Sequence, residues 1–167
     1  MQHGCAAASS LARLGESFAF LARDDRGQSV VVQMNGYAPV RISTFAIENT
    51  FAQFSTVADA IGLSYQQNGH EFYMLTFPTA DQTWVYDLAT QMWHRRARRD
   101  NAGILHRDRA NSIAFFNGET IVGDYASGII YAASLSTFFD YQDAESTGNV
   151  IPRIRTCSEL STSKAMF

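Results

Sequence analysis

The chain has 167 residues, of which 46% are hydrophobic, 13% are aromatic and 17% are charged, and its formal net charge is −3. This length fits one domain with a real core, and the combination of few charges with many aromatic residues excludes an intrinsically disordered chain. The charge excludes a strongly basic nucleic-acid-binding protein, and the absence of a long uninterrupted apolar run argues against a transmembrane helix.

The N-terminal segment around Gly4 and Cys5 has neither the charged start nor the apolar stretch of a secretion signal, so the sequence predicts none. Cys157 is the only other cysteine. One pair of cysteines near opposite ends is no disulfide framework, and a Cys5–Cys157 bridge is not favoured.

Short apolar runs that are rich in β-branched and aromatic residues dominate the chain, and turn residues bound most of them. Asn-Gly pairs at 35–36, 68–69 and 117–118 favour type I′ hairpins, because both central residues need a positive φ. We therefore predict an all-β antiparallel meander with strands near 18–21, 30–32, 61–65, 72–77, 84–86, 113–116 and 129–131.

Only one interval indicates a helix. Ile47, Phe51 and Phe54 recur at helical spacing, and Ser43 or Thr44 could cap the start. The sequence predicts at most one short helix, near residues 45–60. The Ser/Thr-rich residues 156–167 are expected to form a flexible tail.

The chain also repeats itself. Residues 18–21, 30–32 and 40–41 align without gaps with 72–75, 84–86 and 94–95, and residues 68–73 align with 117–122. Such repeats of short antiparallel strands are typical of propeller blades. We predict one propeller-like domain over 1–155, with blades at about 4–43, 58–98 and 110–155. About three blades cannot close a ring, so we expect self-association or pairing with another chain.

The sequence shows no signature of catalysis, of a cofactor or of a metal centre. The common nucleophile, zinc and phosphate-loop motifs are absent, and His3, His70, His94 and His106 share no ligand spacing. Asp24 and Asp25 could form a carboxylate pair, but a turn is the favoured interpretation, as it is for Asp87 and Asp124. We therefore predict that the protein is not an enzyme.

Three ordered strings carry a resemblance to a known family. Residues 24–28 with 35–44, residues 69–87 with Trp93 and His94, and residues 122–131 are similar to the packaged-DNA stabilisation proteins of short-tailed phages, over about residues 4–135. The resemblance implies a propeller-like tail nozzle protein of the virion, made in the host cytoplasm. It also implies a ring of six copies beside portal, adaptor and tail-needle proteins, which helps to retain packaged DNA and forms part of its exit channel.

Members of that family are much longer than this chain, so the chain is a partial-length relative. A split gene, a separate domain and a non-functional prophage remnant remain open. The alternative from another class is a propeller domain that binds a ligand or carbohydrate, or that is hydrolytic. It would need carboxylates and aromatic residues that converge at one end of the blades.

One charged segment is a candidate contact site, and it consists of Arg95, Arg96, Arg98, Arg99, Arg107 and Arg109. Guanidinium groups bind phosphate and carboxylate in bidentate fashion. The segment could touch DNA without sequence specificity. A solvated loop, or ion pairs with an acidic neighbouring subunit, is favoured, because a strong grip on DNA would hinder its ejection.

Overall fold

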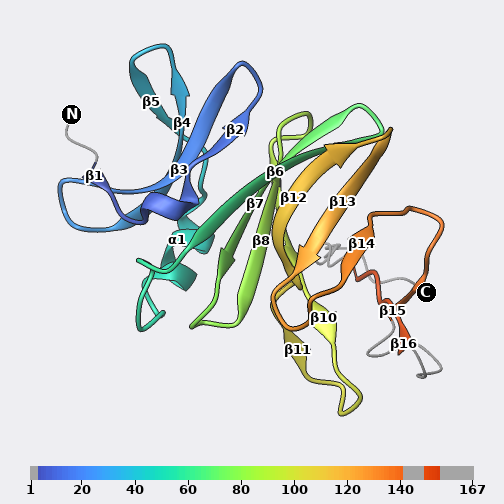
Figure 1. Cartoon of the computed structure of the whole chain (residues 1–167). Helices are drawn as coiled ribbons and strands as arrows, with labels where there is room; N and C mark the ends of the chain where they lie inside the picture. The colour runs from blue at the N-terminus through green and yellow to red at the C-terminus, as the bar shows by residue number, and fades with distance from the viewer. Residues whose placement is uncertain (1–3, 141–148, 155–167) are drawn as a thin grey trace, which may run out of the picture.

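A computed structural model of the chain describes residues 4–140 and 149–154 (Figure 1). The expected tail at 156–167 and Cys157 lie outside these residues. Within them, three antiparallel sheets follow one another along the chain, and one α-helix connects the first sheet to the second. The predicted all-β antiparallel fold with at most one short helix is confirmed.

The first sheet has the strand order β1-β3-β4-β5, and β2 also pairs with β3. A single 3-10 turn, Ala8–Ser10, lies between β1 and β2. The strands are β1 (Gly4–Cys5), β2 (Ala12–Leu14), β3 (Ser17–Arg23), β4 (Ser29–Asn35) and β5 (Ala38–Arg41).

The second sheet is a regular four-stranded meander with the order β6-β7-β8-β9. Asn68 and Gly69 join its first two strands with φ values of 51° and 79°, as the Asn-Gly signal predicts. The strands are β6 (Ile61–Gln67), β7 (His70–Phe77), β8 (Gln82–Asp87) and β9 (Met92–Arg96).

The third sheet has three strands in the order β12-β13-β14. Two short ribbons flank it, β10 with β11 before it and β15 with β16 after it. The strands are β10 (Arg98–Arg99), β11 (Leu105–His106), β12 (Ala110–Phe116), β13 (Glu119–Asp124), β14 (Ile130–Ala132), β15 (Phe139–Asp140) and β16 (Asn149–Val150). That these sheets are blades of one ring, within the boundaries given above, stays a prediction.

The helix α1 (Phe45–Phe51) covers only the first half of the interval expected for it. Thr44 occupies the N-cap position, but its side chain makes no capping hydrogen bond, and Ser43 bonds to the buried carboxylate of Glu48 instead. Beyond Phe51 the chain turns, and the run Ser55-Thr56-Val57 disfavours helix because such residues bond to nearby backbone or lose rotamer freedom.

Pairing registers test the internal repeat. Tyr65 lies opposite Phe72, and Ala114 lies opposite Ile121, so the match between 68–73 and 117–122 is confirmed. The gapless alignment of the first sheet with the second is correct for β3 and β7, but it is displaced by one residue after the loops that follow these strands. Leu21 pairs with Val31, and Leu75 pairs with Trp84, because the loop 24–28 is one residue longer than the loop 78–81.

Apolar side chains fill the space between consecutive sheets. Leu21 and Val31 of the first sheet share one buried cluster with Phe51 of α1 and with Tyr73 and Phe77 of the second sheet. The Tyr73 hydroxyl donates to the Ser10 carbonyl at 2.7 Å, which satisfies the polar atom of a fully buried ring.

A separate cluster joins the second sheet to the third: Met74 and Val85 pack with Ala110, Ile113 and Val122. The three sheets are thus connected in chain order by two interfaces, and Figure 1 shows β12 beside β6. In the described ranges no helix has the length and apolar character needed to span a membrane.

Candidate functional site

The arginine segment, residues 95–109, links the second sheet to the third. Arg95 and Arg96 end β9, Arg98 and Arg99 form β10, and Arg107 and Arg109 lie between β11 and β12. The structure therefore places these side chains along one connection, but on different strands and turns.

Two of these arginines form ion pairs within the chain. Arg96 Nε lies 2.7 Å from Asp108 Oδ2, and Arg96 Nη1 donates to the Tyr65 hydroxyl at 3.2 Å. Arg109 Nη1 donates to Asp124 Oδ2 at 3.1 Å. The Arg96 contacts connect β9 and β6 to the turn before the third sheet, whereas the Arg109–Asp124 pair joins the start of β12 to the end of β13 within the third sheet.

Further arginines contact neighbours of their own chain. The Arg107 guanidinium stacks over the Tyr125 ring, 3.6 Å from its centroid, and Arg99 Nε donates to the Gly103 carbonyl at 3.3 Å. Arg95 is exposed on β9, opposite Trp84. The segment is therefore no uniform row of solvated cations. A contact of these residues with DNA or with a neighbouring subunit stays a prediction.

His106 lies between two carboxylates. Its Nδ1 is 2.7 Å from Asp81 Oδ2, and its Nε2 is 3.2 Å from Asp100 Oδ2. Ionised carboxylates only accept hydrogen bonds, so this geometry favours the protonated imidazole, in which both ring nitrogens donate. The hydrogen bonds to Asp81 and Asp100 accordingly raise the pKa of His106. This arrangement, the His106 clasp, fastens the β10–β11 ribbon to the β7–β8 turn.

The acids of the clasp respond in the opposite direction. Burial opposes ionisation of Asp81, but hydrogen bonds from the Arg107 backbone N–H and from His106 outweigh it and lower its pKa. The Ile104 N–H, which donates to Asp100 at 2.7 Å, is the main reason that the pKa of Asp100 is lowered. All three groups of the clasp are therefore charged at pH values above the pKa values of Asp81 and Asp100 and below the pKa of His106.

The remaining candidate carboxylates close turns, as predicted. Asp24 Oδ1 accepts the backbone N–H groups of Arg26 and Gln28 at 2.9 and 2.8 Å. Asp87 accepts the Ala89 N–H at 2.9 Å, and Asp124 accepts the Ala126 N–H at 2.7 Å. Each closes an Asx-type turn, and Asp87 and Asp124 also contact the side chains of His70 and Arg109. Among the residues that the structure describes, no group of three or more His, Cys, Asp or Glu side chains could hold a metal ion.

The third sheet has one covered face and one open face. Side chains alternate along strands, so Ile113 and Val122, which pack on the second sheet, define the covered face. The residues with the opposite orientation form the outer face. By register these are Ser112, Ala114, Phe116, Glu119, Ile121, Gly123, Ile130 and Ala132.

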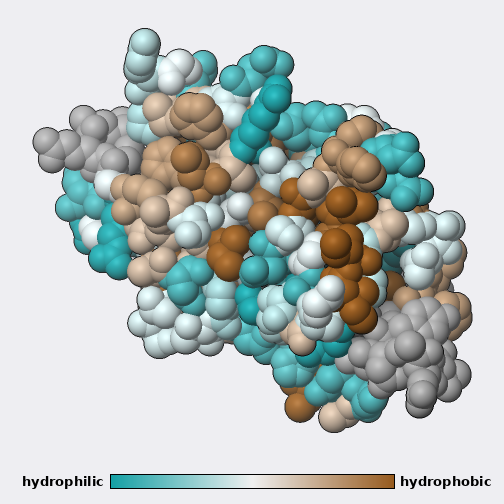
Figure 2. All heavy atoms as spheres, in the orientation of Figure 1, coloured by the Kyte–Doolittle hydropathy of each residue, from teal (hydrophilic) through white to brown (hydrophobic). Residues whose placement is uncertain are grey.

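The outer face is mostly apolar, and Ser112 and Glu119 are its exposed polar members. Phe116 and Ile130 are 70% and 69% exposed, and Figure 2 shows hydrophobic side chains gathered over β13 and β14. Ile121 and Ile130 correspond in the repeat to Phe72 and Val85 of the second sheet, which pack in the cluster shared with the third sheet. The outer face of the third sheet thus corresponds to the face of the second sheet that the third sheet covers. Sequence reasoning predicted open edges, whereas this face became visible only through the register.

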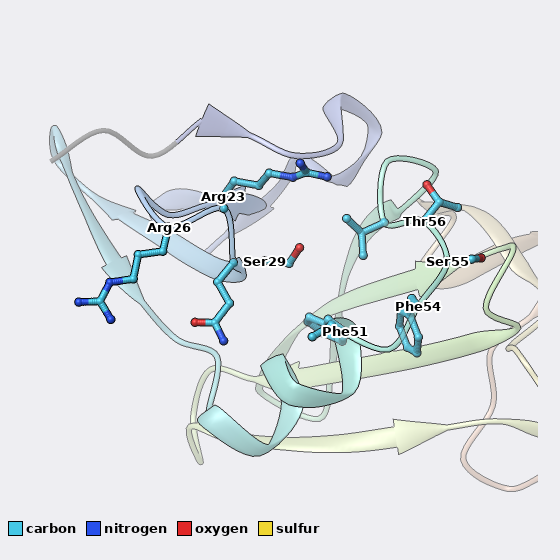
Figure 3. Close-up of a pocket in the computed structure, with 11 residues that line it drawn as sticks. Arg23, Arg26, Ser29, Phe51, Phe54, Ser55 and Thr56 are labelled. Carbon is cyan, nitrogen blue, oxygen red and sulfur yellow. The ribbon is translucent and has the colours of Figure 1, made fainter.

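A hollow of about 410 Å³ lies between the β3–β4 hairpin and the segment that follows α1 (Figure 3). Its lining contains two arginines and several hydroxyl groups above an aromatic floor. The residues are Arg23, Arg26, Gly27, Gln28, Ser29, Phe51, Ala52, Phe54, Ser55, Thr56 and Val57. Sequence reasoning missed this site, because its two walls are separated by more than twenty residues.

Comparison with known protein families identifies a match. The family described as "Bacteriophage P22 Gp10, beta-propeller" matches residues 1–137. That range includes all three sheets and the arginine segment. The search of curated proteins found no match.

Proposed function

The chain belongs to this family of phage DNA-stabilisation proteins, and we propose that it is a structural component of the virion tail, of the nozzle or hub type. In this role it helps to retain packaged DNA and forms part of the channel through which DNA leaves. The observation that carries the proposal is the family match over 1–137, which coincides with three consecutive antiparallel sheets. The family is one of structural proteins and not of enzymes.

The proposal includes assembly with further copies of the chain. The exposed apolar outer face supports it, because an apolar surface of this kind marks an interaction site or an aggregation hazard. A ring of six copies that contacts portal, adaptor and tail-needle proteins is the arrangement that the family resemblance implies. Contact with DNA would be non-specific, because the arginines of the described residues are scattered and cations of this kind contact phosphates and do not read bases.

Particles of the phage that encodes this chain provide the test. Deleting its gene should leave heads that package DNA and then lose it, which is measured as the ratio of filled to empty heads after density-gradient centrifugation. Supplying the intact chain from a plasmid should restore filled heads and infectivity.

A control separates this role from a general loss of expression. The plasmid-borne chain should be found in purified filled particles by mass spectrometry, in several copies per particle. Filled, infectious particles that lack the chain would contradict the proposal and would favour the prophage-remnant alternative.

A further inference from the structure

The hollow of Figure 3 is electrostatically unlike the protein as a whole. The chain carries a net charge of −3, yet the lining includes two arginines and no aspartate or glutamate. Asp24 lies in the same hairpin but does not line the hollow, and its carboxylate accepts backbone N–H groups of the turn. Neither arginine forms an ion pair with a described residue. The lining itself therefore presents positive charge to an anion, and the two acids of the hairpin, Asp24 and Asp25, lie outside it.

The donors are arranged around the opening. Figure 3 shows the Arg23 side chain reaching across the mouth towards Thr56, whereas Arg26 points away from it. Ser29 lies on the wall below Arg23, whereas the Ser55 hydroxyl on the opposite wall points away from Arg23. A planar guanidinium beside hydroxyl donors suits the tetrahedral oxygens of a phosphate, which it can bind in bidentate fashion.

The floor is apolar. Phe51 is buried, and Phe54 packs against Phe51 and Phe77 with ring centroids 5.8 and 4.9 Å apart, so the floor is held in place by the core. Phe54 itself is only half-buried and gives an apolar surface on which a flat group can rest. Bases rest on aromatic rings in this way in proteins that bind single strands. A volume of about 410 Å³ lies within the range of small-molecule sites.

We propose that this hollow binds one nucleotide unit, with its phosphate at Arg23 and its base over Phe54. The unit is either a free nucleotide or part of a single strand. The inference deepens the DNA contact of the proposed function and rests on it for its biological setting. Binding can be measured on the purified chain, so its failure would leave the particle experiment unaffected.

Calorimetric titration of the chain with dTMP tests the site. We expect saturable binding in the micromolar to millimolar range, and weaker binding of inorganic phosphate because it lacks the base. The Arg23→Gln variant should bind dTMP at least about tenfold more weakly, since it loses a charge-assisted hydrogen bond. Arg26→Gln is the matched control: it removes the same charge from the same hairpin, and it should change the affinity less than about threefold.

Three outcomes would overturn the proposal: equal losses in the two variants, equal affinity for dTMP and inorganic phosphate, or no saturation by about 10 mM ligand. The Phe54→Leu variant tests the base contact and keeps an apolar side chain on the floor, and unchanged affinity for dTMP in it would also count against the site. An oligothymidylate that binds more tightly than dTMP would identify a strand as the source of the nucleotide, and an equal or weaker one would identify the free nucleotide. Circular dichroism and an unchanged melting temperature confirm that each variant is folded.

Discussion

Arg96 and Asp108 form an ion pair, with Arg96 Nε 2.7 Å from Asp108 Oδ2, and so connect the last strand of the second sheet to the turn that leads into the third. The same guanidinium reaches the Tyr65 hydroxyl on β6. A residue of the candidate contact site thus also maintains the fold, and the arginine segment has to be tested residue by residue.

Replacing Arg96 with glutamine should destabilise the protein by about 1 kcal/mol, because a partly exposed ion pair and a hydrogen bond to Tyr65 are lost. Urea unfolding followed by circular dichroism measures the effect. Arg95→Gln is the control on the same strand, and as an exposed substitution it should change the free energy of unfolding by less than about 0.5 kcal/mol. Equal effects of the two substitutions would show that the Arg96–Asp108 pair contributes nothing.

The remaining arginines distinguish DNA contact from subunit contact. Each phosphate contact on duplex DNA contributes about 0.9 to the slope of log binding constant against log salt concentration, so replacing Arg95, Arg98 and Arg99 with serine removes up to about 2.7 if all three touch DNA. We expect the slope to stay unchanged and self-association to weaken instead. Filter binding at several salt concentrations measures the slope, and a loss near the upper value would assign these arginines to the DNA path.

The His106 clasp predicts a pH dependence. Because the pKa of His106 is raised in the folded protein, its contribution to stability is complete below the ordinary histidine pKa and is lost as the pH rises through the raised value. The lowered pKa values of Asp81 and Asp100 keep the clasp charged down to acidic pH. The stability difference between the unchanged chain and His106→Gln should therefore be larger at pH 5 than at pH 9, in about the range where histidine titrates. A difference independent of pH would contradict the clasp.

His94 should behave in the opposite way and serves as a comparison. Burial is the main reason that its pKa is lowered, so the folded protein binds this proton less readily than the unfolded chain does. Its contribution is present above the ordinary histidine pKa and is lost as the pH falls. The His94→Gln variant should thus lose less stability on acidification than the unchanged chain, as measured by unfolding at pH 7.5 and pH 5.5.

The buried carboxylate of Glu48 predicts a non-additive pair of substitutions. Glu48 on α1 is fully buried and is bound by Arg41 at the end of β5 and by Ser43. Arg41→Met alone should cost about 3 kcal/mol, because it leaves a buried charge uncompensated. The double variant Arg41→Met with Glu48→Met should recover part of that loss, since an apolar pair of similar volume needs no compensation. Additive losses in the double-mutant cycle would contradict this account.

Much of the architecture follows from local signals in the sequence. The Asn-Gly pairs at 68–69 and 117–118 specify hairpins because their backbones adopt positive φ, and these turns also set the register of β6 with β7 and of β12 with β13. The gapless alignment of the first sheet with the second was wrong after the loop 24–28, which is one residue longer than the loop 78–81. A one-residue shift places every later side chain on the opposite face of the strand, and no local feature of the sequence indicates it.

The sites were harder to predict because they depend on contacts between distant segments. Asp81 and His106 lie on different elements, and only the folded chain brings them within 2.7 Å. The same is true of Arg23 and Thr56, which line one hollow from two walls. A charge-rich segment could be recognised from composition, but which of its arginines pair with aspartates is decided by strand register.

The most direct test of the account is sedimentation velocity of the purified chain with two matched variants. Phe116 lies on the outer face and Phe115 on the opposite face of the same strand, and their exposed fractions are similar, 70% and 76%. We expect the unchanged chain to associate at about micromolar to millimolar concentration, a range in which weak assembly contacts act. The Phe116→Lys variant should remain monomeric, and Phe115→Lys should associate like the unchanged chain. A chain that stays monomeric throughout this range, or equal behaviour of the two variants, would contradict assembly through the outer face.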